Sequence, residues 1–89
     1  MNKEIINVMK ALSDETRIDM VVEIYKKGEV SCQESSSKFD LSQPTLSHHY
    51  KKLIDAGIIK VRKEGVNHFY SVDNKLLETL GIDLSKFIK

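Results

Sequence analysis

Polar side chains that can read nucleic-acid bases follow one another from Gln43 onward, in a segment whose apolar residues have helical spacing. Gln43 can donate to and accept from an adenine edge, Ser47 can bond a base edge or a phosphate, and His48 can donate to a guanine acceptor. Lys51 and Lys52 are better suited to phosphates. Any surface helix is polar on one side, so this face alone is equally compatible with simple solvation.

The residues that follow predict a basic β-hairpin. Residues 59–62 alternate apolar and basic side chains, Glu64-Gly65 predicts a turn, and residues 68–72 predict an aromatic and β-branched return strand. Arg62, Lys63 and Gly65 then lie at or near a cationic tip that can reach an adjacent minor groove or its phosphates. A polar-faced helix followed by such a ribbon is more typical of DNA binding than either feature alone.

The rest of the chain predicts the elements that must position this helix and hairpin. Four helices come first: one over residues 3–12 capped by Asn2, one capped by Ser13 and ended by Gly28, one from the Ser31–Glu34 capping box to Phe39, and one capped by Ser42 and closed by Gly57. The two-stranded wing follows. A last helix begins at Asp73, and Gly81 interrupts it before a final apolar turn that ends at Ile88. The expected fold is mainly α with a small β-hairpin, a winged helix-turn-helix of order ααααββα, in a single domain over residues 1–89.

Composition limits the classes of protein that this chain can belong to. Hydrophobic residues make up 40% and charged residues 30% of the 89 residues, which is typical of a soluble globular domain. The longest apolar runs have three residues, so we expect no membrane segment or signal peptide. One cysteine excludes an intrachain disulfide and favours the cytoplasm. The motifs present do not supply a nucleophile, a base and an orienting group together, so we expect no enzymatic activity and no cofactor.

Charge is distributed unevenly along the chain. Residues 42–89 carry eight Lys or Arg against five Asp or Glu, whereas residues 1–41 carry six against eight. This is the sign expected of a surface that faces phosphates, but the excess is small. A single copy should therefore bind DNA weakly.

The terminal helices contain more apolar residues than a domain of this size needs for its own core. We expect the surplus to form a homodimer interface, which would place two reading helices about 34 Å apart, in successive major grooves. The residues assigned to it are Ile5, Ile6, Met9, Leu76, Leu77, Leu80 and Phe87.

Three segments together resemble the ArsR/SmtB family of bacterial winged-helix repressors: ALSDETRI at Ala11–Ile18, LSQPTLSHHYKKLIDAGII at Leu41–Ile59, and the RKEG-then-HFYSV hairpin. The resemblance implies a homodimer joined through its first and last helices that binds an imperfect inverted repeat in operator DNA until a signal releases it. Ser42, Gln43, Thr45, Ser47 and His48 match the family's reading positions, and Arg62, Lys63 and Gly65 match its wing.

The chain departs from the family at the metal motifs. The family's third-helix motif is Cys-x-Cys after Glu-Leu or Glu-Val, whereas residues 29–33 read Glu-Val-Ser-Cys-Gln with Cys32 alone. The fifth-helix motif needs histidines, yet none follows His68. Sensory zinc sites need about four ligands, with Cys or His prominent, so we expect no metal site.

Two further departures fall on the third and fourth helices. Tyr50 stands where the family usually has leucine, and Ser35-Ser36-Ser37 stand where it has an apolar residue and alanine. The Ser35 and Ser36 hydroxyls would lie at or near a packing face, where each needs a partner such as the carbonyl four residues back. The alternative is that these small residues leave room for a ligand beneath the helix.

The leading hypothesis is a dimeric, sequence-specific transcriptional repressor. A winged-helix module for protein interaction is the first alternative, because the net charge is low and the reading helix has no arginine. The second is a thiol-responsive repressor, in which Cys32 near a helix start is the candidate redox residue. A buried structural cysteine is the commoner role. Any small-molecule or redox effector is unidentified.

Overall fold

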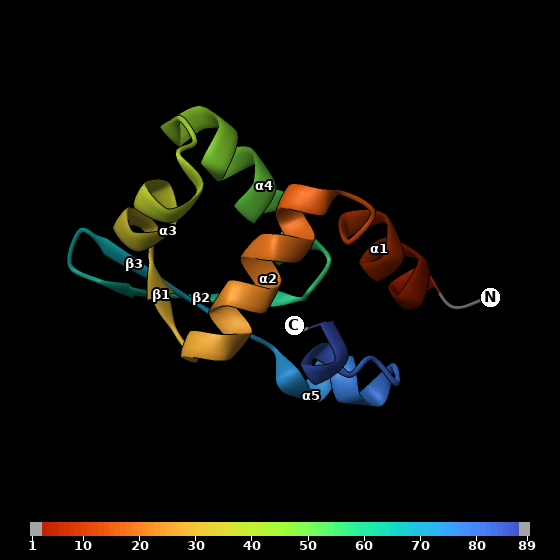
Figure 1. Ribbon diagram of the computed structural model, residues 1–89. Helices are drawn as coiled ribbons and strands as arrows, with labels where there is room; N and C mark the ends of the chain where they lie inside the picture. The colour runs from red at the N-terminus through yellow and green to blue at the C-terminus, as the bar shows by residue number, and fades with distance from the viewer. Residues whose placement is uncertain (1–2, 88–89) are drawn as a thin grey trace.

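The computed structural model describes residues 3–87, so the predicted cap Asn2 and the apolar Ile88 lie outside the described residues. In chain order the elements are α1 (Lys3–Ala11), α2 (Glu15–Lys27), β1 (Val30–Ser31), α3 (Cys32–Phe39), α4 (Gln43–Asp55), β2 (Ile59–Glu64), β3 (Asn67–Val72), α5 (Asn74–Thr79) and the 3-10 helix η1 (Leu84–Phe87). Figure 1 shows the ribbon of β2 and β3 projecting at one end and α1 at the other. The mainly helical fold with a winged helix-turn-helix is confirmed.

The wing belongs to a three-stranded antiparallel sheet of order β1-β3-β2, so the predicted two-stranded hairpin was incomplete. In β1, Val30 lies opposite Tyr70 and Ser31 opposite Phe69. The long ribbon runs from the pair Ile59 and Val72 to the pair Glu64 and Asn67 at the tip. A strand of two residues is too short to show alternation, which is why the sequence pattern missed β1.

The capping box predicted at the start of α3 is confirmed. The Ser31 hydroxyl accepts from the Glu34 backbone amide at 3.1 Å, and the Glu34 carboxylate accepts from the Ser31 amide at 3.0 Å. Ser31 also ends β1. The sheet therefore fixes the point at which the first helix of the helix-turn-helix begins.

The predicted cap of α2 was wrong by one residue. The carboxylate of Asp14 accepts from the Arg17 backbone amide at 2.9 Å, whereas the Ser13 hydroxyl donates back to the Lys10 carbonyl at 2.7 Å. Arg17 also donates through Nε to the Ala11 carbonyl at 2.6 Å, and its guanidinium lies 3.4 Å from Nδ1 of His49. The start of α2 is thus tied to the end of α1 and to α4.

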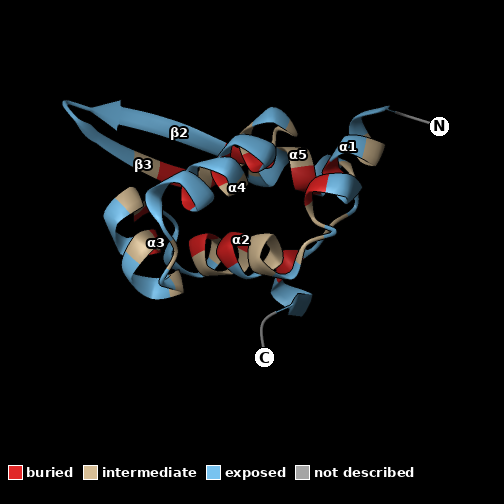
Figure 2. Cartoon of the chain, turned by 90° about the horizontal axis from the view of Figure 1, so that it is seen from above, coloured by how far each residue is buried: buried red, intermediate tan, exposed pale blue. Residues whose placement is uncertain are grey.

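The core lies between the helices and the inner part of the sheet (Figure 2). Its most deeply buried side chains are Val8, Met20, Val21, Ile24, Leu46, Leu53, Ile58 and Leu77. The helical spacing of α4 predicts Leu46, Tyr50, Leu53 and Ile54 on the core side. The first three are buried, and Ile54 is half-buried and packed against the core. None of the helices within residues 3–87 has the length and apolar character needed to cross a membrane.

The cap geometry predicts different outcomes for two adjacent substitutions. Asp14→Ala should lower the free energy of unfolding by about 0.5–2 kcal/mol, because a free amide at the start of α2 loses its acceptor. Ser13→Ala, the control, should change it by less than about 0.5 kcal/mol, because that hydroxyl is exposed. Urea unfolding followed by circular dichroism measures both. A larger loss for Ser13→Ala would restore Ser13 as the cap.

The same interaction gives the Asp14 cap a pH dependence. The hydrogen bond from the Arg17 amide is the main cause that holds the pKa of the Asp14 carboxyl below its ordinary value. A lowered pKa in the folded state stabilises the fold above the ordinary aspartate pKa, and this contribution disappears as the pH falls through the lowered pKa. The stability difference between wild type and Asp14→Ala should therefore shrink in acid.

Candidate nucleic-acid interface

The N-terminal half of α4 exposes the polar residues that the sequence assigned to reading. Ser42, Gln43, Thr45, Ser47, His48, Lys51 and Lys52 are all exposed. Ser42 is the N-cap, as predicted, and its hydroxyl donates to Thr45 Oγ1 at 2.9 Å and accepts from the Thr45 amide at 3.4 Å. The hydroxyls of Ser42 and Thr45 therefore hold the helix start, and they are less available to DNA than the side chains of Gln43, Ser47 and His48 farther along the exposed face.

Gln43 is in contact with the preceding helix. Its Oε1 accepts from the Cys32 thiol at 3.7 Å, and the two residues line one surface hollow together with His68 of the wing. Gln43, at the start of α4, therefore lies where α3, α4 and the ribbon meet. His48 and His49 have ring centroids 6.0 Å apart with the rings tilted by 59°.

The ribbon presents two chemically different faces. Side chains alternate along a strand, and residues directly opposite each other share a face. Lys63 lies opposite His68, and both are on the face that carries Tyr70, toward the helices. Arg62 lies opposite Phe69, and its guanidinium carbon is 4.6 Å from the centre of the Phe69 ring, on the other face. Lys63 and His68 therefore lie on the face of the ribbon that is directed toward α4, and Arg62 lies on the opposite face.

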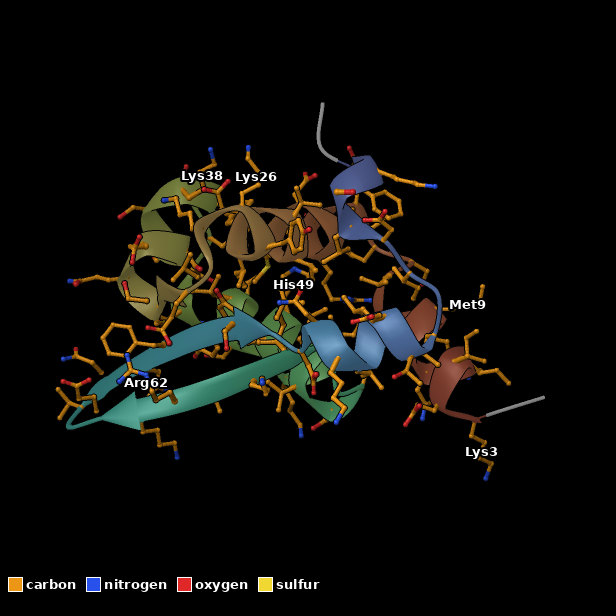
Figure 3. The ribbon with its side chains drawn as sticks, turned by 90° about the horizontal axis from the view of Figure 1, so that it is seen from below. Lys3, Met9, Lys26, Lys38, His49 and Arg62 are labelled. Atoms are coloured by element: carbon orange, nitrogen blue, oxygen red, sulfur yellow. The ribbon has the colours of Figure 1, made fainter. Side chains whose placement is uncertain are left out.

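Arg62 is held by two carboxylates of its own chain. Its guanidinium donates to both oxygens of Glu29, at 3.2 and 2.9 Å, and to Glu64 at 2.6 Å. These hydrogen bonds raise the pKa of Arg62, and hydrogen bonding from Arg62 lowers the pKa of Glu29. In Figure 3 Arg62 lies on the ribbon, away from α1. Arg62 thus ties the wing to the segment before β1, and its charge is largely offset.

The other predicted phosphate anchors differ in their partners. Lys51 makes an ion pair with Asp55 at 3.1 Å, one helical turn away. Lys52 and Lys63 make no ion pair with any residue of the described range 3–87. Gly65 has φ +62°, at the two-residue turn between Glu64 and Asn67. Its conformational freedom gives this glycine a structural role in shaping the tip.

The serine hydroxyls of α3 find partners other than the expected carbonyls. Ser35 Oγ is hydrogen-bonded to the hydroxyl of Tyr50, and Ser36 Oγ donates to the Leu41 carbonyl at 3.5 Å. Within residues 3–87, no buried side-chain nitrogen or oxygen lacks a partner. The contacts of these serines therefore support a packing face with satisfied hydroxyls, and not a space for a ligand beneath α3. No sequence signal links Ser35 with Tyr50, because the two lie in different helices.

The residues present do not fit the family's metal chemistry. The described residues contain no group of three or more His, Cys, Asp or Glu side chains able to hold an ion. The Cys32 thiol has Gln43 as its partner, and Ser31 and Gln33 beside it are poor ligands for soft metals.

The apolar residues assigned to a dimer interface separate into three groups. Leu77 is only 2% exposed and belongs to the core of the chain itself, so its assignment to an interface was wrong. Phe87 is exposed but lines a surface hollow with Ile18, Val22 and Phe39, apart from the main group. Ile5, Ile6, Met9, Leu76 and Leu80 remain partly or fully exposed on α1 and α5.

A helix-turn-helix whose second helix exposes hydrogen-bonding side chains, followed by a β-ribbon with lysines, defines the class of winged-helix DNA-binding proteins. The profile of the family "Bacterial regulatory protein, arsR family" matches residues 14–61. The chain therefore belongs to this family and is a DNA-binding transcriptional regulator.

Two curated relatives and one solved structure illustrate the likeness. The arsenical resistance operon repressor of Staphylococcus aureus is 35% identical, covering 88% of this chain and 74% of its own. The transcriptional repressor SdpR of Bacillus subtilis is 32% identical, covering 81% and 79%. The structure of HlyU from Vibrio cholerae superposes with a TM-score of 0.77 at 28% identity, covering 91% of both chains.

The partners of the two wing cations predict different contributions to DNA binding. Lys63→Ala should lower the slope of log affinity against log salt by about one, because a phosphate contact is lost. Arg62→Ala should lower it by much less, because Glu29 and Glu64 already offset its charge. Titrations at several salt concentrations measure both slopes.

Lys26→Ala is the matched control, since it removes an exposed charge from α2, away from the ribbon (Figure 3). It should leave the slope unchanged. Equal losses for Lys63→Ala and Arg62→Ala would instead show that Arg62 exchanges its carboxylates for a phosphate when DNA binds.

Proposed function

We propose that this chain is a homodimeric repressor that binds an imperfect inverted repeat in operator DNA. In this proposal α4 enters the major groove and the wing lies against the flanking backbone. The observation that carries it is the division of α4, where Leu46, Tyr50 and Leu53 are buried and Gln43, Ser47 and His48 are exposed. Repression is supported by the two relatives, both named repressors. Such a regulator acts on chromosomal DNA, so we propose a cytoplasmic location.

The proposed dimer uses the apolar surface of α1 and α5, at the end of the molecule opposite the wing tip (Figures 1 and 2). Met9 is 61% exposed. A second copy would cover it together with Ile5, Ile6, Leu76 and Leu80. Two linked reading helices also compensate for the weak charge of one copy, because the second binding event becomes intramolecular.

Selection of binding sites from random DNA tests this function. The enriched sites should carry two inverted half-sites whose centres are about one helical turn, or a multiple of it, apart. Enrichment of a single asymmetric half-site would rule out DNA binding as a dimer. Absence of any salt-sensitive enrichment would rule out sequence-specific DNA binding and favour the protein-interaction alternative.

The same selection checks the reading residues. Gln43→Ala or His48→Ala should relax one base preference in each half-site, by about 1–3 kcal/mol at that position. Lys52→Ala is the control, because loss of a phosphate contact should weaken all sequences alike. An unchanged base preference in both reading variants would transfer the reading role to other residues.

Thiol control of the repressor is a second candidate, favoured by the contact between Cys32 and Gln43. Hydrogen peroxide transfers an oxygen atom to a thiolate, giving a sulfenic acid and releasing hydroxide, which takes up a proton as water. The modified sulfur is larger and would displace Gln43 from its position at the start of α4.

Peroxide should therefore weaken operator binding by wild type and leave Cys32→Ser unaffected. Mass spectrometry confirms the added oxygen, and a thiol reductant should restore binding by wild type. If wild type is oxidised at Cys32 and still binds the operator with unchanged affinity, the thiol has no regulatory role.

A further inference from the structure

The middle of α3 is anchored by a polar residue. Ser35 is the buried residue of this helix, at 3% exposure, whereas Cys32 and Phe39 near its two ends are half-buried. Most amphipathic helices dock through an apolar stripe. Where α3 faces α4, its position therefore depends on the interaction that Ser35 makes.

Tyr50 of α4 supplies that interaction and extends it to the sheet. Its hydroxyl is hydrogen-bonded to Ser35, and its ring stacks on the ring of Tyr70, with centroids 3.7 Å apart and planes 10° apart. Tyr70 belongs to the central strand and lies opposite Val30 of β1 and Val61 of β2. The column Ser35–Tyr50–Tyr70 thus joins both helices of the helix-turn-helix to the base of the wing.

The column lies in the interior, where a hydrogen bond is strong and an unpartnered group is costly. Tyr50 is 2% and Tyr70 6% exposed. Burial is the main cause that raises the pKa of Tyr50 to about 12, so the hydroxyl remains protonated at neutral pH. Figure 1 shows α3 and α4 beside each other next to the strands, the arrangement that the column holds.

A hydroxyl pair constrains helices differently from apolar packing. The hydrophobic driving force is non-directional, whereas hydrogen bonds weaken steeply with distance and angle. Gln43, Ser47 and His48 project from α4 away from its buried side. A small rotation of α4 therefore moves these groups relative to the wing and relative to base edges.

We propose that Ser35 and Tyr50 are positioning residues for DNA reading, because their hydroxyl pair, stacked on Tyr70, sets the orientation of α4 relative to α3 and the wing. The inference rests on the proposed function and goes beyond it, because neither residue touches DNA. It assigns reading geometry to two residues of the protein interior.

Three variants test the proposal: Ser35→Ala, Tyr50→Phe and the double variant. Each single variant buries one unpartnered hydroxyl, which should lower stability, whereas the double variant buries none and should recover it. Alanine suits a helix and phenylalanine keeps the stacked ring, so the folds should survive. Urea unfolding gives the stability, and titration of the selected operator, at a temperature where each variant is folded, gives the affinity.

The expected result separates positioning from stability. Each single variant should bind the operator about tenfold more weakly, as for the loss of one base contact. In the double variant stability should recover while the affinity remains about tenfold lower, because the directional contact is absent. Ser37→Ala, in the exposed part of α3, and Tyr25→Phe, in α2, are matched controls and should retain wild-type affinity.

Two results would overturn the proposal. Either the single variants bind the operator as tightly as wild type, or the double variant regains affinity together with stability. In both cases the pair only packs the interior. Failure of wild-type protein to enrich any DNA sequence would instead overturn the proposed function, and this inference with it.

Discussion

The pairing of β1 with β3 is the constraint on which the positions of the helix-turn-helix and the wing depend. Ser31 is at once the sheet partner of Phe69 and the N-cap of α3. One residue earlier, Val30 lies opposite Tyr70, the residue on which Tyr50 of α4 stacks. The central strand therefore locates both helices of the helix-turn-helix and, through β2, the wing.

Charge contributes less to this surface than the residue count indicates. Arg62 is offset by Glu29 and Glu64, and Lys51 by Asp55. Exposed ion pairs of this kind add little to stability, but each one weakens the field that a phosphate would meet. In the proposed dimer, affinity for DNA would then depend more on hydrogen-bond geometry at α4 and on the second copy than on electrostatic attraction.

Local signals explain how much of this fold the sequence predicts. Helical spacing and capping residues are signals between residues only a few positions apart in the sequence. They correctly predicted the extent of α4, its buried face and the Ser31 capping box. Ser13 and Asp14 are both good caps, so composition could not separate them, and only the contact with the Arg17 amide does. The two-residue β1 is defined by its partner strand.

The column within the interior lay beyond sequence reasoning for a different reason. Ser35 and Tyr50 are separate departures from the family pattern, fifteen residues apart, and no periodicity links them. In the structure they are one feature, because a leucine at position 50 would leave the Ser35 hydroxyl buried without a partner, and an alanine at position 35 would do the same to Tyr50. Each departure therefore supplies the hydrogen-bond partner of the other. The contact between α3 and α4 is directional, so it specifies the orientation of α4 as well as stabilising it.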